Sequence, residues 1–279
     1  MGNHLLAVMA PELRVHVHEA QWAAEQTPIL RLPGSGELTA AIDPPLTFAK
    51  SFREHLPTSV VTNDSRLTRA DLLALGRSLL PDSDEGELLA FLFAVNAWGY
   101  GTSGRGLHRT LTVAEDNQAA FLGSARGAVS ILHDPDRDSA AVDAYYYLLN
   151  QAAGHVTGWG PAFFTKFLAF ADPANQPSEV LDRDCALILD QWIAAAVNHY
   201  LPEAFKSRKA SRRSPLGHFG TTGWTTPQYA YYLRLVRQLT RESTFREAPY
   251  NGSPMAVERV LFHYFRDGEG RNAGVAEGH

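Results

Sequence analysis

Cysteine is almost absent from this chain, which has one, Cys185, among 279 residues. A single cysteine excludes a disulfide framework and any zinc or iron–sulfur site built from several cysteines. The sequence also lacks an apolar run of the roughly 18–20 residues that span a bilayer. Residues 1–10 lack the cationic stretch of a signal peptide. We therefore expect a globular protein of the cytoplasm that does not enter a membrane.

A net positive charge is lacking as well. The chain has 25 Lys and Arg against 30 Asp and Glu, a formal net charge of −5 at pH 7. Such a chain is not a polycation that coats nucleic acid, so any binding to nucleic acid must come from a local patch. Apolar residues make up 45% and charged residues 20%, which is typical of a globular protein with a substantial core.

The first 60 residues predict little regular structure, because six prolines interrupt them and their apolar residues keep no sustained period. Only Leu13–His18 alternates between apolar and polar residues, which predicts a short strand. His16 and His18 would share one face of that strand and could bind a metal. No third ligand lies near them in the sequence, so an exposed strand face is the preferred interpretation. We expect residues 1–60 to form an irregular extension packed on the core.

From Thr68 onward the apolar residues follow the helical period. Thr68 can cap a helix that runs to Leu80, and the nearly all-apolar Glu85–Asn96 predicts a buried helix. A glycine-dense loop is expected from Trp98 to Gly106. Further helices are predicted at Asn117–Ser130, Ser139–Ala153, Pro161–Ala171, Gln191–Tyr200, Pro227–Glu242 and Pro254–Arg266. The sequence thus predicts a mainly α domain over residues 61–266, followed by a flexible tail over residues 267–279.

The most informative motif is Gly158-Trp159-Gly160, which separates two of the predicted helices. Pro161 is favoured at the first position of a helix, so the second helix should begin directly after the motif. The glycines allow a tight turn that exposes backbone N–H groups. Those donors, together with the helix dipole, can bind a phosphate. The alternative is a plain tight turn between two helices.

An aspartate follows this hairpin at the end of Leu187–Asp190, between an apolar run and another apolar helix. Together with the hairpin at Gly158–Phe170, this pattern resembles the helix-hairpin-helix DNA glycosylase superfamily. More narrowly, it resembles a bacterial group with the 8-oxoguanine DNA glycosylase fold. Supporting matches are Ala97–Gly101, Gly104–Gly106, Trp224, Tyr229, Tyr232, Glu258, Leu261 and Phe262. The resemblance covers about residues 60 to 265, and it implies a two-lobed helical fold with the helix-hairpin-helix at about residues 139–171.

The resemblance implies a catalytic role for the aspartate. In the superfamily it stabilises the positive charge that develops on the sugar as the base leaves, or it activates the attacking nucleophile. Asp190 has the better local setting, at the start of an apolar helix. Asp182 lies 22 residues after Gly160, nearer the usual spacing than Asp190, which lies 30 residues after it. We favour Asp190 and keep Asp182 as the alternative, while a plain helix cap remains open for either residue.

Superfamily members with lyase activity add a lysine whose amine attacks C1′ and forms a Schiff base. That lysine usually lies two residues after the second glycine, where this chain has Ala162. Lys166 follows one helical turn later on the same face and is the candidate here. The alternative is a lysine that points to solvent and lays its aliphatic stem on an apolar helix.

Base flipping also needs an aromatic face on which the base stacks and a wedge for the gap left in the duplex. Trp98 and Tyr100 are the candidates, with Arg105 and Arg109 as phosphate contacts. The alternative is a structural loop with Trp98 in the core. A basic cluster further along the chain would lie along the DNA backbone, or would form a solvated loop. Its members are Lys206, Arg208, Lys209, Arg212 and Arg213.

With the resemblance, the sequence predicts a monomeric DNA glycosylase. It would flip a modified base out of double-stranded DNA and hydrolyse the N-glycosidic bond, with lyase activity if Lys166 is a nucleophile. No metal or organic cofactor is implied. The base would be 8-oxoguanine-like or a base made by bacteriophages, so the role would be DNA repair or defence against phage. The alternatives are a helix-hairpin-helix DNA-binding module without catalysis and a helical protein-interaction domain.

Overall fold

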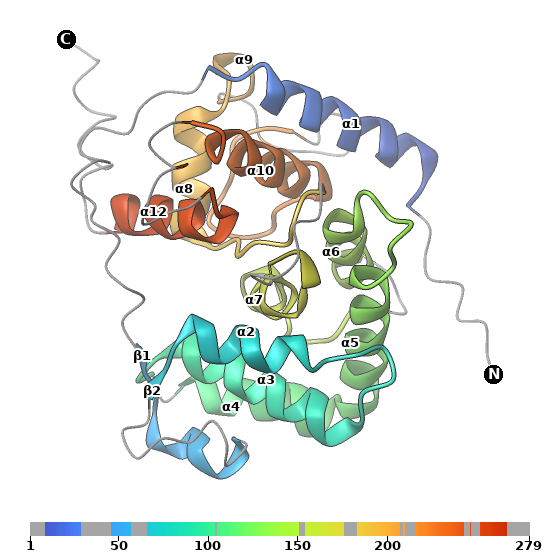
Figure 1. Cartoon of the computed structure of the whole chain (residues 1–279), viewed down its shortest axis with the longest axis vertical. Helices are drawn as coiled ribbons and strands as arrows, with labels where there is room; N and C mark the ends of the chain where they lie inside the picture. The colour runs from blue at the N-terminus through green and yellow to red at the C-terminus, as the bar shows by residue number, and fades with distance from the viewer. Residues whose placement is uncertain are drawn as a thin grey trace. The chain divides into compact units, whose positions relative to one another are not determined.

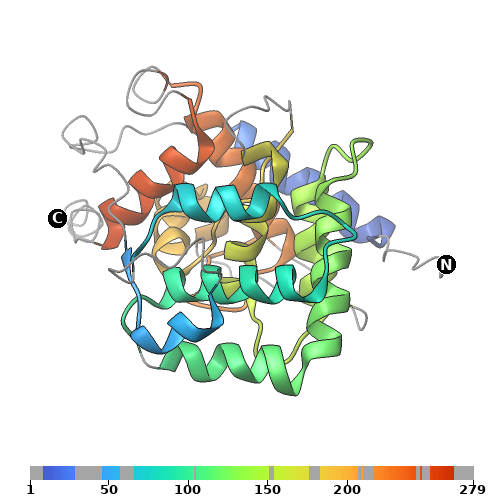
Figure 2. The ribbon, with the colours of Figure 1, turned by 60° about the horizontal axis from the view of Figure 1, so that its bottom comes forward.

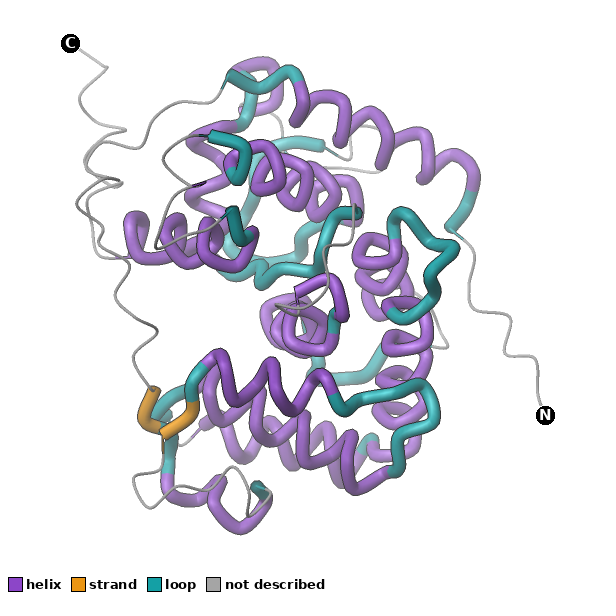
Figure 3. Tube along the Cα trace, in the orientation of Figure 1, coloured by secondary structure: helices purple, strands orange, loops and turns teal. Residues whose placement is uncertain are grey.

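The computed structural model describes residues 9–28, 46–56, 66–103, 105–150, 154–175, 183–206, 209, 216–242, 246 and 252–266. These residues are mainly helical, as predicted (Figure 1, Figure 3). Strands in this part of the chain are limited to β1 (Leu46–Thr47) and β2 (Arg66–Leu67). They pair antiparallel, with Leu46 opposite Leu67. The fold of the described residues therefore depends on packing between helices.

The chain forms two compact units. The first consists of Met1–Val8 and Ile42–Ala186, and the second consists of Met9–Ala41 and Leu187–His279. The second unit is thus assembled from two stretches that are far apart in the sequence, because helix α1 (Pro11–Glu25) packs with C-terminal helices.

The described helices of the first unit surround α7 (Pro161–Ala171). The others are α2 (Arg69–Arg77), α3 (Glu85–Tyr100), α4 (Arg105–Leu111), α5 (Gln118–Leu132) and α6 (Ala140–Asn150). Helix α7 packs against α2, α3, α5 and α6, and every residue from Phe164 to Ala171 is buried. Within the same unit, Figure 2 shows α3 between α2 and α4. The turn that precedes α7 is therefore anchored in the core of the unit.

Helices α2 and α3 each begin with a capping box, in which two polar residues exchange hydrogen bonds between side chain and backbone. The Thr68 hydroxyl accepts a hydrogen bond from the Asp71 N–H, and the Asp71 carboxylate accepts one from the Thr68 N–H. Asp84 and Glu87 form the same pair at α3. These capping boxes satisfy N–H groups that have no partner in the first turn of a helix. Both predicted helix starts are confirmed.

Helix α3 continues beyond its predicted end and includes both Trp98 and Tyr100. It ends at Gly101, whose φ of 56° lies in the left-handed region that glycine adopts at little cost. The loop predicted from Trp98 to Gly106 is wrong at both ends, since α4 also begins before Gly106. Packing of Trp98 against Phe170 of α7 helps to keep the last turn helical against the low propensity of its glycine.

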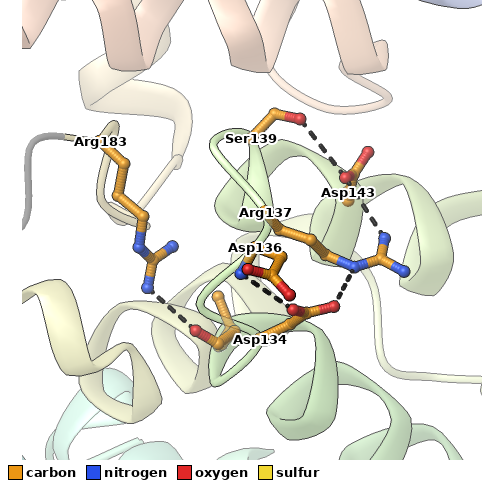
Figure 4. Close-up of polar contacts among 7 residues, drawn as sticks. Asp134, Asp136, Arg137, Ser139, Asp143 and Arg183 are labelled. Carbon is orange, nitrogen blue, oxygen red and sulfur yellow. Dashed lines mark hydrogen bonds and ion pairs between the residues drawn. The ribbon is translucent and has the colours of Figure 1, made fainter.

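A network of charged side chains forms the start of α6 (Figure 4). Arg137 Nε donates to Asp134 Oδ2 at 2.9 Å, and Arg137 Nη1 donates to Asp143 Oδ2 at 3.4 Å. The Ser139 hydroxyl donates to the same Asp143 oxygen. The Arg137 guanidinium and the Asp136 N–H hold the pKa of Asp134 below its usual value. The network links the residues between α5 and α6 to the first turn of α6.

A buried ion pair follows α7. Asp172 is 0% exposed and accepts hydrogen bonds from Arg183 Nη2 and from the Ala186 N–H, both at 2.7 Å. Arg183 Nη2 also donates to the Leu132 carbonyl at the end of α5. Burial raises the pKa of the Asp172 carboxyl, and the charge of Arg183 opposes that rise. The pair joins the ends of α5 and α7 to the last residues of the first unit.

The second unit contains α1 and four further described helices: α8 (Gln191–Tyr200), α9 (Glu203–Lys206), α10 (Thr226–Leu239) and α12 (Pro254–Arg266). Helix α1 packs along α10, and α12 contacts both α8 and α10. The helices predicted at Gln191–Tyr200 and Pro254–Arg266 are confirmed to the residue, as is the helix at Pro161–Ala171 in the first unit.

The short strand predicted at Leu13–His18 is wrong, because this stretch belongs to helix α1. Val15, one of the alternating apolar residues, is 55% exposed. His16 and His18 are two residues apart on a helix, so they do not share a face. The residues of α1 that are buried follow the helical period instead: Val17, Ala20, Ala23 and Ala24.

Candidate functional site

The turn between α6 and α7 has a backbone conformation that requires glycine. Gly158 has a φ of 87°, where a side chain would be strained. Gly160 accepts hydrogen bonds from the N–H groups of Phe163 and Phe164, and Pro161 occupies the first helical position of α7. Proline has no N–H and those of Phe163 and Phe164 are bonded, so Ala162 supplies the N–H of the first turn of α7 that remains for an anion.

Trp159, between the two glycines, anchors this turn. It is 3% exposed, and its ring packs edge to face on Phe121 and Phe167 at centroid distances of 5.0 Å and 5.3 Å. The indole is therefore part of the core and is not presented to a ligand. The backbone N–H of Trp159 also has a partner, because it donates to the Val156 carbonyl at 3.1 Å, so Trp159 holds the turn and offers no donor for the phosphate contact that the sequence predicts.

Lys166 lies on the buried side of α7. It is 8% exposed, and its Nζ donates a 2.6 Å hydrogen bond to the Ala162 carbonyl. The Nζ also lies 5.6 Å from the centre of the Phe163 ring. Gly99 of α3 makes room for this side chain, because a Cβ at position 99 would lie 2.8 Å from Lys166 Cδ. The alternative of a lysine pointing to solvent is therefore wrong.

Tyr100 and Arg109 both contact the Phe163 ring beside the turn. Tyr100 stacks on Phe163 at 4.9 Å, and the Arg109 guanidinium carbon lies 4.7 Å from the same ring centre. Arg109 Nε donates to the Gly158 carbonyl at 3.2 Å. Burial raises the pKa of the Tyr100 hydroxyl, and the charge of Arg109 opposes that rise. Arg109 thus brings a positive charge to the start of α7, where it adds to the attraction of the helix dipole for an anion.

Asp190 belongs to the second unit and caps α8. Its Oδ1 accepts hydrogen bonds from the Trp192 N–H at 2.9 Å and the Ile193 N–H at 3.0 Å. Its other oxygen, Oδ2, has no partner among the residues that the structure describes. A carboxylate held through one oxygen presents the other in a fixed direction. Preorganised charge of this kind is what stabilisation of a developing cation requires.

Residues 38–262, which include the turn, Lys166 and Asp190, match a protein family described as "Putative 8-oxoguanine DNA glycosylase OGG-like protein". The chain belongs to this family. No curated protein and no solved structure matches it. The match confirms the resemblance drawn from the sequence, and a family of DNA glycosylases implies DNA as the substrate.

In this member of the OGG-like family, Trp98 takes part in helix packing. Its ring meets Phe170 of α7 edge to face at 5.3 Å, and the Arg69 guanidinium carbon of α2 lies 5.2 Å from its centre. These contacts favour the structural interpretation of Trp98. Tyr100 also packs within its unit, since its ring stacks on Phe163 next to the glycine turn and its hydroxyl is buried.

Three side chains of α10 and α12 hold the backbone that leads into α8. The Tyr229 hydroxyl accepts from the Leu187 N–H at 3.1 Å and donates to the Leu187 carbonyl at 2.9 Å. The Tyr232 hydroxyl donates to the Ile188 carbonyl at 2.9 Å, and Glu258 Oε2 accepts from the Ile188 N–H at 3.3 Å. The sequence assigns these residues to the family pattern, but it contains no signal for the role of their polar atoms.

Some predicted residues lie outside the described part of the chain. These are Asp182, Arg208, Arg212 and Arg213, together with the side chain of Arg105, whose backbone belongs to α4. Of the basic cluster, Lys209 is exposed and its backbone forms a bridge with His218. Lys206 donates to Glu203 at 2.6 Å, and this carboxylate offsets part of the positive charge that Lys206 contributes to the cluster.

The described residues contain no group of three or more His, Cys, Asp or Glu side chains that could hold a metal ion. Within the same ranges, no helix is both long and apolar enough to cross a membrane. The first unit has a cavity of about 440 Å³ whose lining includes Arg77, His133 and Arg183. Neither Lys166 nor Tyr100 lines this cavity, so it is separate from the candidate residues at the glycine turn.

Proposed function

We propose that this chain flips a modified base out of duplex DNA and hydrolyses its N-glycosidic bond. The observation that carries the proposal is the Asp190 carboxylate, which is fixed through Oδ1 at the start of α8 and has Oδ2 available. Membership of the family supplies the class of reaction.

Asp190 is the proposed catalytic acid residue. Departure of the base leaves positive charge on the sugar, and a preorganised carboxylate stabilises that charge without reorganisation. The same carboxylate can take the proton of an attacking water. Asp182, which lies outside the described residues, is the alternative for this role.

The glycine turn and α7 are the proposed seat for a DNA phosphate, in the manner of a helix-hairpin-helix. The support is the conformation of Gly158, the N-terminal position of Pro161, and the Arg109 charge that is bonded to the turn. Backbone donors at a helix start bind a phosphate without reading the base. This contact would position the duplex, while other residues select the base.

Lys166 is the proposed nucleophile of a lyase step. Its neutral amine would attack C1′ and form a C–N bond, while the base leaves with the electrons of the N-glycosidic bond. Loss of the amine proton and opening of the sugar ring then produce a Schiff base. The support is the buried position of Lys166 on α7, where its amine is held at the Ala162 carbonyl.

The proposed base is 8-oxoguanine, as in the description of the family, or a modified base of bacteriophage DNA. A fold shared with a repair enzyme does not set the substrate. Excision of an oxidised base would be DNA repair, whereas excision of phage-made bases would create abasic sites in invading DNA and defend the cell.

The test is base release by the purified full-length chain. Substrates are a duplex with one 8-oxoguanine, the same duplex with guanine, and genomic DNA of phages that modify their bases. Abasic sites are detected by alkaline strand cleavage. We expect cleavage in at least one modified DNA and none in the guanine duplex. DNA binding without cleavage in any substrate would support the non-catalytic DNA-binding module instead, and absence of DNA binding would favour a protein-interaction domain.

A further inference from the structure

We infer that Tyr229, Tyr232 and Glu258 are positioning residues that set the direction of the Asp190 carboxylate. This inference rests on the proposed function, because it concerns the same carboxylate. It begins from Leu187 and Ile188, which are 1% and 3% exposed and do not belong to a helix or strand.

Buried backbone outside regular structure still needs hydrogen-bond partners. At Leu187 and Ile188, all four backbone polar groups have one, and each partner is a side chain of α10 or α12. Tyr229 bonds both groups of Leu187, much as a neighbouring strand would. Side chains 42 to 70 residues away in the sequence thus determine where this backbone lies.

We call these four hydrogen bonds the clamp. Only Leu189 separates the backbone held by the clamp from Asp190. On its other side, Asp190 is held by the N–H groups at the start of α8. The carboxylate is therefore fixed from both directions along the chain, and Oδ2 has little freedom to change direction. The cap by itself is enough to start α8. The clamp additionally restricts the movement of the backbone that precedes Asp190.

Tyr229 and Tyr232 are three residues apart on one face of α10, with ring centres 6.2 Å apart. Tyr231, between them, is equally buried but turns to other partners. Its hydroxyl donates to the Tyr200 carbonyl at 3.1 Å and lies 2.9 Å from the Thr27 hydroxyl. Tyr231→Phe therefore removes the same atom from the same helix without touching the clamp, and it is a matched control.

The experiment compares Tyr229→Phe, Tyr232→Phe and Tyr231→Phe in single-turnover base release, with Kd for the substrate duplex measured in parallel. We expect each clamp variant to slow base release roughly 10-fold. This loss is smaller than the loss of about 10²-fold in rate that a misplacement of about 1 Å can cause. Kd should not change, because no phosphate contact is removed. Tyr231→Phe should retain the wild-type rate. Tyr232→Phe removes one of the four hydrogen bonds to Leu187 and Ile188, whereas Tyr229→Phe removes two, so Tyr232→Phe is the variant better able to keep the fold.

A second measurement separates positioning from general loosening of the unit. Each tyrosine variant is combined with Asp190→Asn, and the residual rate is measured. If the tyrosines act through the carboxylate, they should cause no further loss in the Asp190→Asn background. A merely structural role would lower both backgrounds by the same factor and would overturn the inference.

The outcomes also separate this inference from the proposed function. A wild-type chain that releases no base from any substrate overturns the proposed function and the inference together. An active wild type whose Tyr229→Phe and Tyr232→Phe variants match Tyr231→Phe overturns the inference alone.

Discussion

Lys166 Nζ donates a 2.6 Å hydrogen bond to the carbonyl of Ala162, the position at which lyases of the resembling superfamily carry their lysine. Long side chains on a helix point back toward its N-terminus, so an amine that starts one turn later returns to the same part of α7. This placement supports the proposal that Lys166 substitutes for the lysine that position 162 lacks.

A Schiff base between Lys166 and C1′ can be reduced to a stable adduct. With borohydride present, the wild-type chain should become covalently linked to substrate DNA, and Lys166→Gln should form no adduct. Lys50→Gln, which changes an exposed lysine of the same unit, should crosslink like the wild type. The measurement is the shifted band on a denaturing gel. Normal base release without any adduct would show a glycosylase that has no lyase step.

Replacement of Gly99 should lower adduct formation by Lys166 without lowering the free energy of unfolding. A Cβ in Gly99→Ala would lie 2.8 Å from Lys166 Cδ, so the flexible lysine must move. Adduct formation should fall by about 3- to 10-fold through lost alignment, while the free energy of unfolding stays equal or rises because alanine favours a helix. Gly123→Ala on α5 meets no atom within 4 Å and should leave adduct formation unchanged. An equal effect of both variants would contradict the placement of Lys166.

Asp190→Asn should lower base release about 10²- to 10⁴-fold, as expected for loss of one electrostatic or acid–base group. Kd for DNA should not rise, because removal of a negative charge does not weaken binding to phosphate. Asp84→Asn is the control, since Asp84 caps α3 in a comparable way but has no proposed role in the reaction. A fully active Asp190→Asn, together with an inactive Asp182→Asn, would transfer the role to Asp182.

The basic cluster should control the salt dependence of DNA binding. Each neutralised phosphate contributes about −0.9 to the slope of log K against log salt for duplex DNA. Replacement of Arg208, Lys209, Arg212 and Arg213 by Gln should flatten that slope by roughly 2–3 units if most of them touch phosphate. Modified and unmodified duplexes should lose the same affinity, because phosphates carry no base information. A slope identical to that of the wild type would show that the cluster faces away from DNA.

Arg183 should be important for the stability of the first unit. Arg183→Met leaves the Asp172 carboxylate buried without its ion-pair partner, and loss of one partner of a buried pair costs about 3–5 kcal/mol in the free energy of unfolding. Lys206→Met breaks the exposed pair with Glu203, which should cost less than about 1 kcal/mol. Urea denaturation measures both. Equal costs would mean that Asp172 is neutral in the folded protein.

Helices were predictable where their ends carry local signals and their buried residues are large. Pro161 and Pro254 begin helices at their predicted positions. Helix α1 was missed because three of its four buried residues are alanines, which contribute little to an apolar pattern. The valines that suggested a strand are more conspicuous in the sequence, yet Val15 is exposed. Burial depends on the partner helix, and the partner of α1 is α10, about two hundred residues away.

The sequence by itself determined the mainly helical class, the glycine turn before α7 and the aspartate that begins α8. Each of these depends on local chemistry: the helical period, the φ of glycine and proline, and the side-chain oxygen of a cap. Only the tertiary structure decided that Lys166 is buried against Gly99 and that Tyr229 and Tyr232 hold the backbone before Asp190. Those placements depend on packing and hydrogen bonds between residues that are distant along the chain, and no local pattern encodes them.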